Sequence, residues 1–227
     1  MKKTYFLLII GLITAGCIIY GSYRHLGFSG MEKSSNNNIE ISGDNPVALQ
    51  EFSSIKVDCH VSAIRIQEGD SFQLKSTYNR ESLKPNCEIS NGRLTISQKH
   101  YRKSPFYQAC KLYLTVPSGT KLDFIEIDSD VGDVEIRDLS GNKIRIDLNV
   151  GKIELSKIDF DEILIENNVG ETSISTNNDI SEYSMDLSTD VGDVSVADNT
   201  YKQQYKSNVN SSKRIVVDNN VGAIKIR

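Results

Sequence analysis

The chain has 227 residues, enough for one large domain or two small ones, and 25% of them are charged while 38% are hydrophobic. Few aromatic residues, no tryptophan and a formal net charge of −4 favour a β-rich globular body and argue against nucleic acid as the main partner. The sequence contains neither a GxSxG nor an HExxH motif and no Cys/His metal spacing. We therefore expect no enzymatic activity, no cofactor and no metal.

The N-terminus carries a membrane signal. Lys2 and Lys3 precede an uncharged run over residues 4–23, about the 20 residues that cross a bilayer as a helix. We expect residues 1–24 to form a signal anchor, a single-pass transmembrane helix that leaves the C-terminal domain extracellular. The string LITAGC also resembles a lipoprotein processing site, so lipidation at Cys17 is the alternative and simple cleavage a third outcome. Each outcome exports the rest of the chain.

Residues 25–39 are expected to form a linker, because they are rich in Gly, Ser and Asn and lack apolar periodicity. Beyond them a string such as IRIDLNVGKIEL, residues 144–155, recurs at residues 55–66, 125–136, 163–174, 185–196 and 215–226. Every copy has valine at its seventh position. Five copies have glycine at the eighth position, with spacings of 19, 19, 22 and 30 residues: Gly132, Gly151, Gly170, Gly192 and Gly222. A period near 20 residues indicates a solenoid.

The alternation of apolar residues predicts how each repeat turns. Side chains along a β-strand alternate between its two faces, so a break in the alternation marks a corner. Ile144, Ile146, Leu148 and Val150 fall on one face, and the alternation then breaks at Gly151. We predict that the five glycines are structural corners and that residues 40–227 form an all-β, single-stranded β-solenoid with coils of roughly 19–22 residues.

Both ends of the predicted solenoid differ from its middle. Residues 67–123 break the period and contain Asn91-Gly92 between alternating residues, a strong hairpin signal, so we expect an antiparallel cap region at the N-terminal end. The last repeat ends one residue before Arg227. The C-terminal coil is therefore expected to lack a cap, which would permit edge-to-edge self-association.

Polar residues recur beside each corner. Asn149 and Asn168 interrupt the carboxylates at the outward sixth position, so this row is interpreted as turn residues rather than as a Ca²⁺ site. The sixth-position residues and their neighbours beyond the glycine are His60, Asp130, Asn149, Asn168, Asp190, Asn220, Asp133, Glu171 and Asp193. The inward fifth position is also polar in several copies and must find hydrogen-bond partners there: Cys59, Ser129, Leu148, Asn167, Thr189 and Asn219.

The cysteines do not form an obvious disulfide framework, because three follow Cys17. Cys59 falls on the inward register, where we expect a buried and inert thiol. Cys87 and Cys110 flank the predicted hairpin, and the sequence leaves open whether they are bridged.

Two basic, tyrosine-bearing segments without acids interrupt the repeats, at residues 99–111 and 199–214. Lysine and arginine can contact phosphates and tyrosine offers a stacking face, so both are candidate binding loops for anionic wall polymers or lipid headgroups, although a merely solvated loop would have the same composition. Their candidate residues are Tyr101, Arg102, Lys103, Tyr107, Tyr201, Lys202, Tyr205, Lys206, Lys213 and Arg214.

The repeats, together with the VPSGT turn in LYLTVPSGTKLDFIEIDSDVGDVEI (residues 112–136), resemble a bacterial envelope family of candidate adhesins that includes LiaG-like proteins. The resemblance covers residues 40–227, although Ser62 replaces the corner glycine in the first copy. It implies an exported β-solenoid-like domain and brings no catalytic residue. We therefore expect a membrane-anchored, non-catalytic binding or structural module of the cell envelope, with wall polymer or envelope proteins as partners. An accessory role in envelope-stress signalling and a self-assembling scaffold are alternatives.

Overall fold

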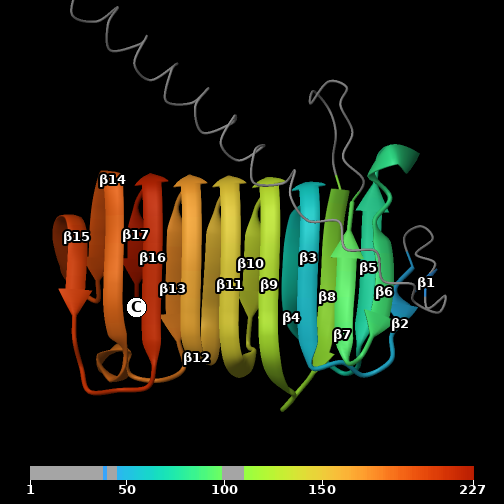
Figure 1. Ribbon diagram of the computed structural model, residues 1–227, viewed down its shortest axis with the longest axis horizontal. Helices are drawn as coiled ribbons and strands as arrows, with labels where there is room; N and C mark the ends of the chain where they lie inside the picture. Colours follow the sequence, from blue (N-terminus) through green and yellow to red (C-terminus); the bar gives the residue numbers. More distant parts are fainter. Residues whose placement is uncertain (1–37, 40–44, 99–109) are drawn as a thin grey trace, which may run out of the picture. The chain divides into compact units, whose positions relative to one another are not determined.

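The computed structural model describes residues 38–39, 45–98 and 110–227, all within one unit spanning residues 37–227 (Figure 1). Its regular elements are strands and two single-turn 3-10 helices, η1 (Glu81–Leu83) and η2 (Ile180–Glu182). The all-β prediction is confirmed for these residues. The predicted anchor and linker lie outside them, and within the described ranges no helix has the length and apolar character that a bilayer crossing requires.

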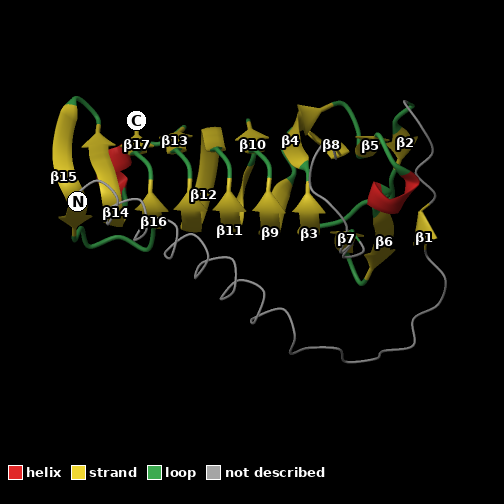
Figure 2. Ribbon diagram, turned by 90° about the horizontal axis from the view of Figure 1, so that it is seen from above, coloured by secondary structure: helices red, strands yellow, loops and turns green. Residues whose placement is uncertain are grey.

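Parallel pairing between successive repeats builds the middle of the unit. Its strands are β3 (Ser54–Val61), β4 (Ala63–Gly69), β9 (Lys121–Val131), β10 (Val134–Arg137), β11 (Ser140–Val150), β12 (Ile153–Val169) and β13 (Thr172–Thr176). The longer segments form a front row and the shorter segments a back row (Figure 2). Ile144 pairs with both Ile125 and Ile163, so successive coils are offset by one repeat. Equivalent residues of successive copies consequently lie side by side.

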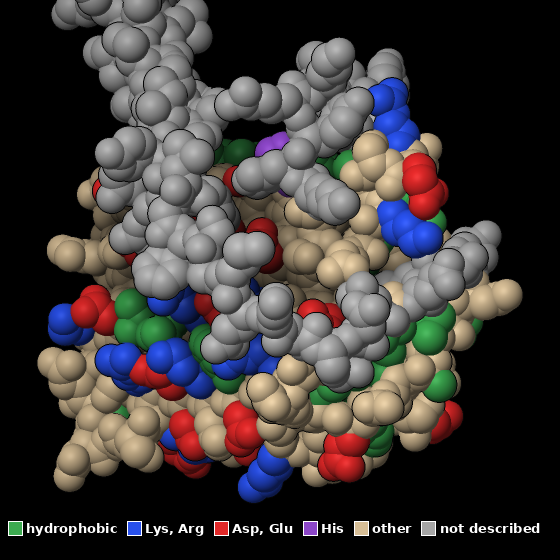
Figure 3. Space-filling model, turned by 45° about the vertical axis from the view of Figure 1, so that its right-hand side comes forward, with side chains coloured by type: hydrophobic (Ala, Val, Ile, Leu, Met, Phe, Trp, Pro, Cys, Tyr) green, Lys and Arg blue, Asp and Glu red, His purple; other side chains and the backbone are tan. Residues whose placement is uncertain are grey.

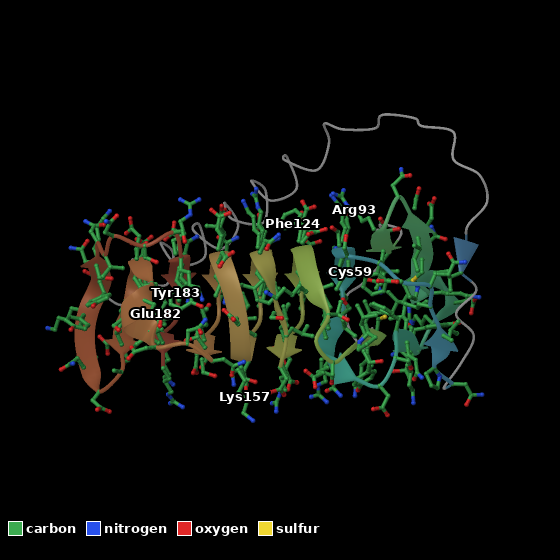
Figure 4. All side chains as sticks on the ribbon, turned by 90° about the horizontal axis from the view of Figure 1, so that it is seen from below. Cys59, Arg93, Phe124, Lys157, Glu182 and Tyr183 are labelled. Atoms are coloured by element: carbon green, nitrogen blue, oxygen red, sulfur yellow. The ribbon has the colours of Figure 1, made fainter. Side chains whose placement is uncertain are left out.

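The burial pattern of β12 shows how one coil surrounds the core. Its buried side chains fall into three runs, which begin at Ile153, Ile158 and Ile163. The alternation resets between the runs, and Lys157 turns the chain at the first reset with a left-handed φ of 52°. Lys157 extends outward from the coil, whereas Cys59 and Tyr183 point inward (Figure 4). The buried side chains of the stacked coils form one continuous core, in which each fully buried aliphatic side chain contributes about 1.5–3 kcal/mol.

The N-terminal end contains the predicted antiparallel strands and one additional coil. β6 (Asn86–Ser90) and β7 (Arg93–Ser97) form a hairpin in which Asn91 and Gly92 both have left-handed φ angles, as a two-residue type I′ turn requires. β5 (Gln73–Tyr78) pairs antiparallel with β8 (Cys110–Pro117). However, β7 and β8 pair in parallel with β3 and β4, so they belong to the stack of coils. The outermost strands are β1 (Asn38–Ile39) and β2 (Val47–Ala48).

The C-terminal repeat does not lie at the end of the stack. β16 (Arg214–Val221) and β17 (Ile224–Ile226) pair in parallel with β12 and β13 on one side. On their other side they pair with β14 (Ser184–Val196). The chain thus leaves β13, forms β14 one coil further out, turns through β15 (Asn199–Ser207) and returns into the gap. The expectation of an uncapped C-terminal coil is wrong, because residues 215–226 lie between two earlier repeats (Figure 1).

Candidate binding surface

Glycine is required where each coil turns from the front row to the back row. The five glycines have φ angles from +140° to +157°. A Cβ on Gly170 would overlap the carbonyl oxygen of Gly151 and stand 2.7 Å from its carbon, closer than real Cβ atoms approach. The other four corners meet the neighbouring coil in the same way. Each of these Cβ atoms would meet the carbonyl group of the corner in the adjacent coil, so the contacts give the order of the corners. Along the stack this order is Ser62, Gly132, Gly151, Gly170, Gly222 and Gly192.

Ser62 begins this series of corners, and its position explains why it need not be glycine. It is buried between β3 and β4 and has no left-handed φ. Its carbonyl faces Gly132, as the glycine carbonyls do in later coils. On its other side, at the end of β7, Gln98 Oε1 accepts hydrogen bonds from the backbone N–H groups of His60 and Val61. β3 pairs in parallel with β9, and β4 pairs in parallel with β10, where Ile64 lies beside Val134. The first copy is therefore part of the stack.

A ladder of side-chain hydrogen bonds runs along the outward sixth position. Asn149 donates from Nδ2 to Oδ1 of Asp130 at 2.8 Å, and Asn168 donates to Asn149 at 2.7 Å. Asn220 continues the ladder by donating to Asn168 at 2.7 Å, while His60 contacts Asp130 at its other end. These side chains stabilise the contact between coils. In the part of the chain that the structure describes, no group of three or more His, Cys, Asp and Glu residues is arranged to hold a metal ion.

Three of the inward polar side chains donate to corner carbonyls, whereas the buried Oγ of Ser129 has no hydrogen-bond partner among the described residues. Asn167 Nδ2 donates to the carbonyl oxygen of Gly151 at 3.2 Å, and Asn219 donates to that of Gly170 at the same distance. Thr189 Oγ1 donates to the carbonyl oxygen of Gly222 at 2.9 Å. Buried polar groups are costly unless they are hydrogen-bonded, so these residues support the corners and do not form a ligand site.

A row of acids on the outer face of the front strands was missed by the sequence reasoning. The fourth position of five copies carries a carboxylate, and the parallel register makes them successive neighbours, about 4.8 Å apart. Their side chains face outward because the residues on either side in each strand are buried. We call this set the acidic row: Asp58, Asp128, Asp147, Glu166 and Asp218. Adjacent carboxylates concentrate negative potential along the stack.

The valines before the corner glycines face solvent, so the prediction that Val150 faces the core is wrong. The alternation resets at Asn149, whose side chain joins the ladder, and Val150 is 46% exposed. The register places these valines side by side across five coils. They form an apolar strip that we call the valine ridge: Val131, Val150, Val169, Val221 and Val191. It lies a few residues along each strand from the acidic row.

The predicted C-terminal binding loop is mostly a strand. Tyr201, Lys202, Tyr205 and Lys206 lie on β15, which pairs antiparallel with β14. Lys206 Nζ lies 2.7 Å from a carboxylate oxygen of Asp186.

The two basic residues that follow β15 are also held by acids of the same unit. Lys213 Nζ lies 3.0 Å from Asp159, and Arg214 binds Glu162. A hydrogen bond from Lys143, and to a smaller extent one from Arg214, lowers the pKa of Glu162. Cations and acids are likewise interspersed over the lower part of the face in Figure 3. Lys213 and Arg214 therefore support the fold more than they offer free charge to a ligand.

Several other sequence predictions fall on residues that the structure leaves undescribed. These are Cys17 and the four candidate residues of the first basic segment, Tyr101, Arg102, Lys103 and Tyr107.

The three described cysteines are buried free thiols, so Cys87 and Cys110 are not bridged. Burial raises the pKa of the Cys87 thiol to about 12 and raises that of Cys59 still further. Burial likewise raises the pKa of Cys110. Thiols held protonated in this way are poor nucleophiles.

A polar cavity lies where the chain returns from the back row to the front row. It has a volume of about 230 Å³ and is lined by Glu68, Thr120, Asp138 and neighbouring residues. Pockets that enclose a small organic ligand usually measure about 300–1,000 Å³. This cavity is therefore a weaker candidate for a ligand site than the surface rows.

Comparison with known proteins gives one family and several structural neighbours. The family model described as Toastrack DUF4097 matches residues 52–162 and again residues 117–227. A candidate cell adhesion protein from Clostridium sporogenes superimposes with a TM-score of 0.63 at 17% identity, covering 80% of this chain and 97% of that chain. A candidate adhesin from Bacteroides fragilis has a TM-score of 0.38 at 14% identity, covering 85% of this chain and 98% of that chain. No curated protein matches the sequence.

Proposed function

Because the chain belongs to the toastrack DUF4097 family, we propose that it is a non-catalytic, adhesin-like binding module of the bacterial cell envelope. The description of the Clostridium sporogenes neighbour as a candidate cell adhesion protein agrees with this role. In the proposal, Lys2, Lys3 and the apolar run after them hold the β-solenoid at the outer face of the cell membrane as a single-pass anchor. Lipidation at Cys17 is the alternative form of attachment.

The observation that carries the proposal is the repetition of one surface along the stack. Each central coil adds one carboxylate to the acidic row and one valine to the valine ridge, in register with its neighbours. Such a surface offers the same contacts at regular intervals, which suits an extended polymer better than a compact substrate. Its chemistry is complementary to a wall polymer that has apolar groups and free amines, because the carboxylates attract positive charge.

The proposal can be tested with the full-length chain in detergent micelles and purified cell-wall sacculi. Co-sedimentation measures how much protein the sacculi retain. We expect the triple substitution Val150→Ser, Val169→Ser and Val221→Ser to reduce retention strongly. Val209→Ser is compared with the single substitution Val169→Ser as a control, because Val209 is 38% and Val169 39% exposed but Val209 lies outside the ridge.

A second pair of variants tests the charge of the same surface. Glu166→Gln combined with Asp218→Asn removes two charges from the acidic row, whereas Asp161→Asn combined with Glu182→Gln removes two exposed charges elsewhere. Retention should fall for the first pair and stay unchanged for the second, and added salt should weaken binding by the wild type. If all of these variant proteins bind like the wild type, wall polymer is not held by this surface.

A further inference from the structure

β15 covers one end of the stack incompletely. Seven of its nine residues are exposed, and of its side chains Tyr205 packs partly against the core. Among the described strands, only β14 pairs with β15, so its outer edge presents backbone donors and acceptors. The opposite end finishes in β1 and β2, which have two residues each. The longer open edge is therefore at β15, on the left of Figure 1.

Two tyrosines close the core at this end. Tyr205 pairs with the buried Leu187, and Tyr201 pairs with the buried Val194, so both rings continue rows of core side chains. Their ring centroids are 4.7 Å apart. Tyr201 is still 37% exposed. The apolar column therefore ends in aromatic surface that a further layer could cover.

We propose that β15 is a self-recognition edge, through which two copies of the chain dock end to end across a two-fold axis. The two β15 strands pair antiparallel in a register centred on Gln203. Tyr201 then lies opposite Tyr205 of the second copy, and the four tyrosines extend both cores across the interface. An interface of this isologous kind closes after two copies and does not continue into a fibre.

The shape of β15 selects this centre. Gln203 has a left-handed φ of 63°, and its Nε2 donates to the carbonyl oxygen of Asp190 at 2.8 Å. The register with β14 shifts there, between Ser188 and Asp193, so β15 bends around the corner in two arms. A two-fold axis through the bend exchanges the arms, and the bent edge is therefore complementary to itself.

Charge favours this register over the two registers next to it. Centred on Gln203, Lys202 lies opposite Gln204 of the second copy and Lys206 lies opposite Thr200. A register centred on Gln204 would set Lys202 against Lys206, and one centred on Lys202 would set that lysine against itself. Like charges directly opposite one another destabilise a strand pair. Charge therefore disfavours the two registers next to the one centred on Gln203, and the bend at Gln203 selects that centre.

Sedimentation velocity of the full-length chain in detergent micelles, over a wide concentration range, tests the proposal. The wild type should reach a dimer. Gln204→Lys places a lysine opposite Lys202 twice in each dimer and should raise the dissociation constant at least about fivefold. Gln204→Glu places a carboxylate there and should lower the constant. Asn199→Lys is the matched control: it adds the same charge to the same strand, but opposite Ser207, and should change the constant less than about twofold.

A wild type that stays monomeric would overturn the proposal, and so would equal effects of Gln204→Lys and Asn199→Lys. A dimer that none of the three variants alters would arise elsewhere in the chain, which also refutes a β15 interface. Binding to sacculi is measured separately, at the acidic row and valine ridge. Failure of that proposed function would therefore leave the result at β15 unaffected.

Discussion

Replacing Gly170 with alanine tests the physical basis of the stack. The new Cβ would overlap the carbonyl oxygen of Gly151 and lie 2.7 Å from its carbon, at a residue whose φ is +150°. The oxygen cannot easily move aside, because it accepts a hydrogen bond from Asn167 at 3.2 Å. Moving these two coils apart would weaken the backbone bond from Gly151 N to the carbonyl oxygen of Val169, now 2.9 Å.

The expected cost follows from these contacts. A non-glycine residue in such a backbone conformation costs about 1–3 kcal/mol. Each weakened hydrogen bond adds about 0.5–1.5 kcal/mol, and two are affected, so the total is about 2–6 kcal/mol. Gly119→Ala is the matched control. Gly119 also has a left-handed φ, +78°, but a Cβ there would meet no atom within 4 Å. Its substitution should cost only about 1–2 kcal/mol.

Urea denaturation of the full-length chain, followed by far-ultraviolet circular dichroism, gives the measurement. We expect the midpoint to fall for both variants and to fall much further for Gly170→Ala. A midpoint for Gly170→Ala no lower than that for Gly119→Ala would refute the argument, because backbone conformation alone would then explain the loss. A change in the slope of the transition would instead indicate that the coils unfold separately.

Three further substitutions test other features by the same denaturation assay. Asn168→Asp removes the donor to Asn149 and sets two acceptors together, so we expect a loss of about 1–2 kcal/mol; an unchanged midpoint would count against the ladder. Lys157→Gly should leave stability unchanged or raise it by up to about 1 kcal/mol, because φ is 52° there and its backbone hydrogen bonds do not need the side chain. Burial raises the pKa of Cys87 to about 12, so above its ordinary value near 9 the unfolded chain releases a proton that the folded chain retains. Stability should be fully present below pH 9 and fall as the pH rises from 9 toward 12, and Cys87→Ala should make that fall shallower; equal slopes would show that the thiol does not contribute.

The local features of the fold could be predicted from the sequence because they depend on neighbouring residues. The reset of apolar alternation at Gly151 implies a turn, and Asn91-Gly92 implies a tight hairpin. The acid at the fourth position of five repeats was also visible in the sequence. That these acids form a continuous row could not be predicted, because only parallel pairing in register makes Asp147 a neighbour of Asp128 and Glu166.

Other features depend on how the chain turns in three dimensions. Period-two alternation assigned Val150 to the core, but the alternation resets at Asn149, two residues before Gly151, and the Val150 side chain reaches solvent. The segment around Tyr201 and Lys202 has the composition of a loop. It becomes a strand because β14 offers it an unpaired edge.

The all-β class, the repeat and the glycines at which the chain turns follow from the amino-acid sequence alone. The sequence did not determine the order in which the coils stack. All repeats present similar aliphatic side chains to the core and similar backbone groups to their neighbours, so local pattern cannot distinguish one neighbour from another. Tertiary structure decided that residues 215–226 enter between two earlier repeats, and it thereby left β15, and not the C-terminal coil, as the exposed edge.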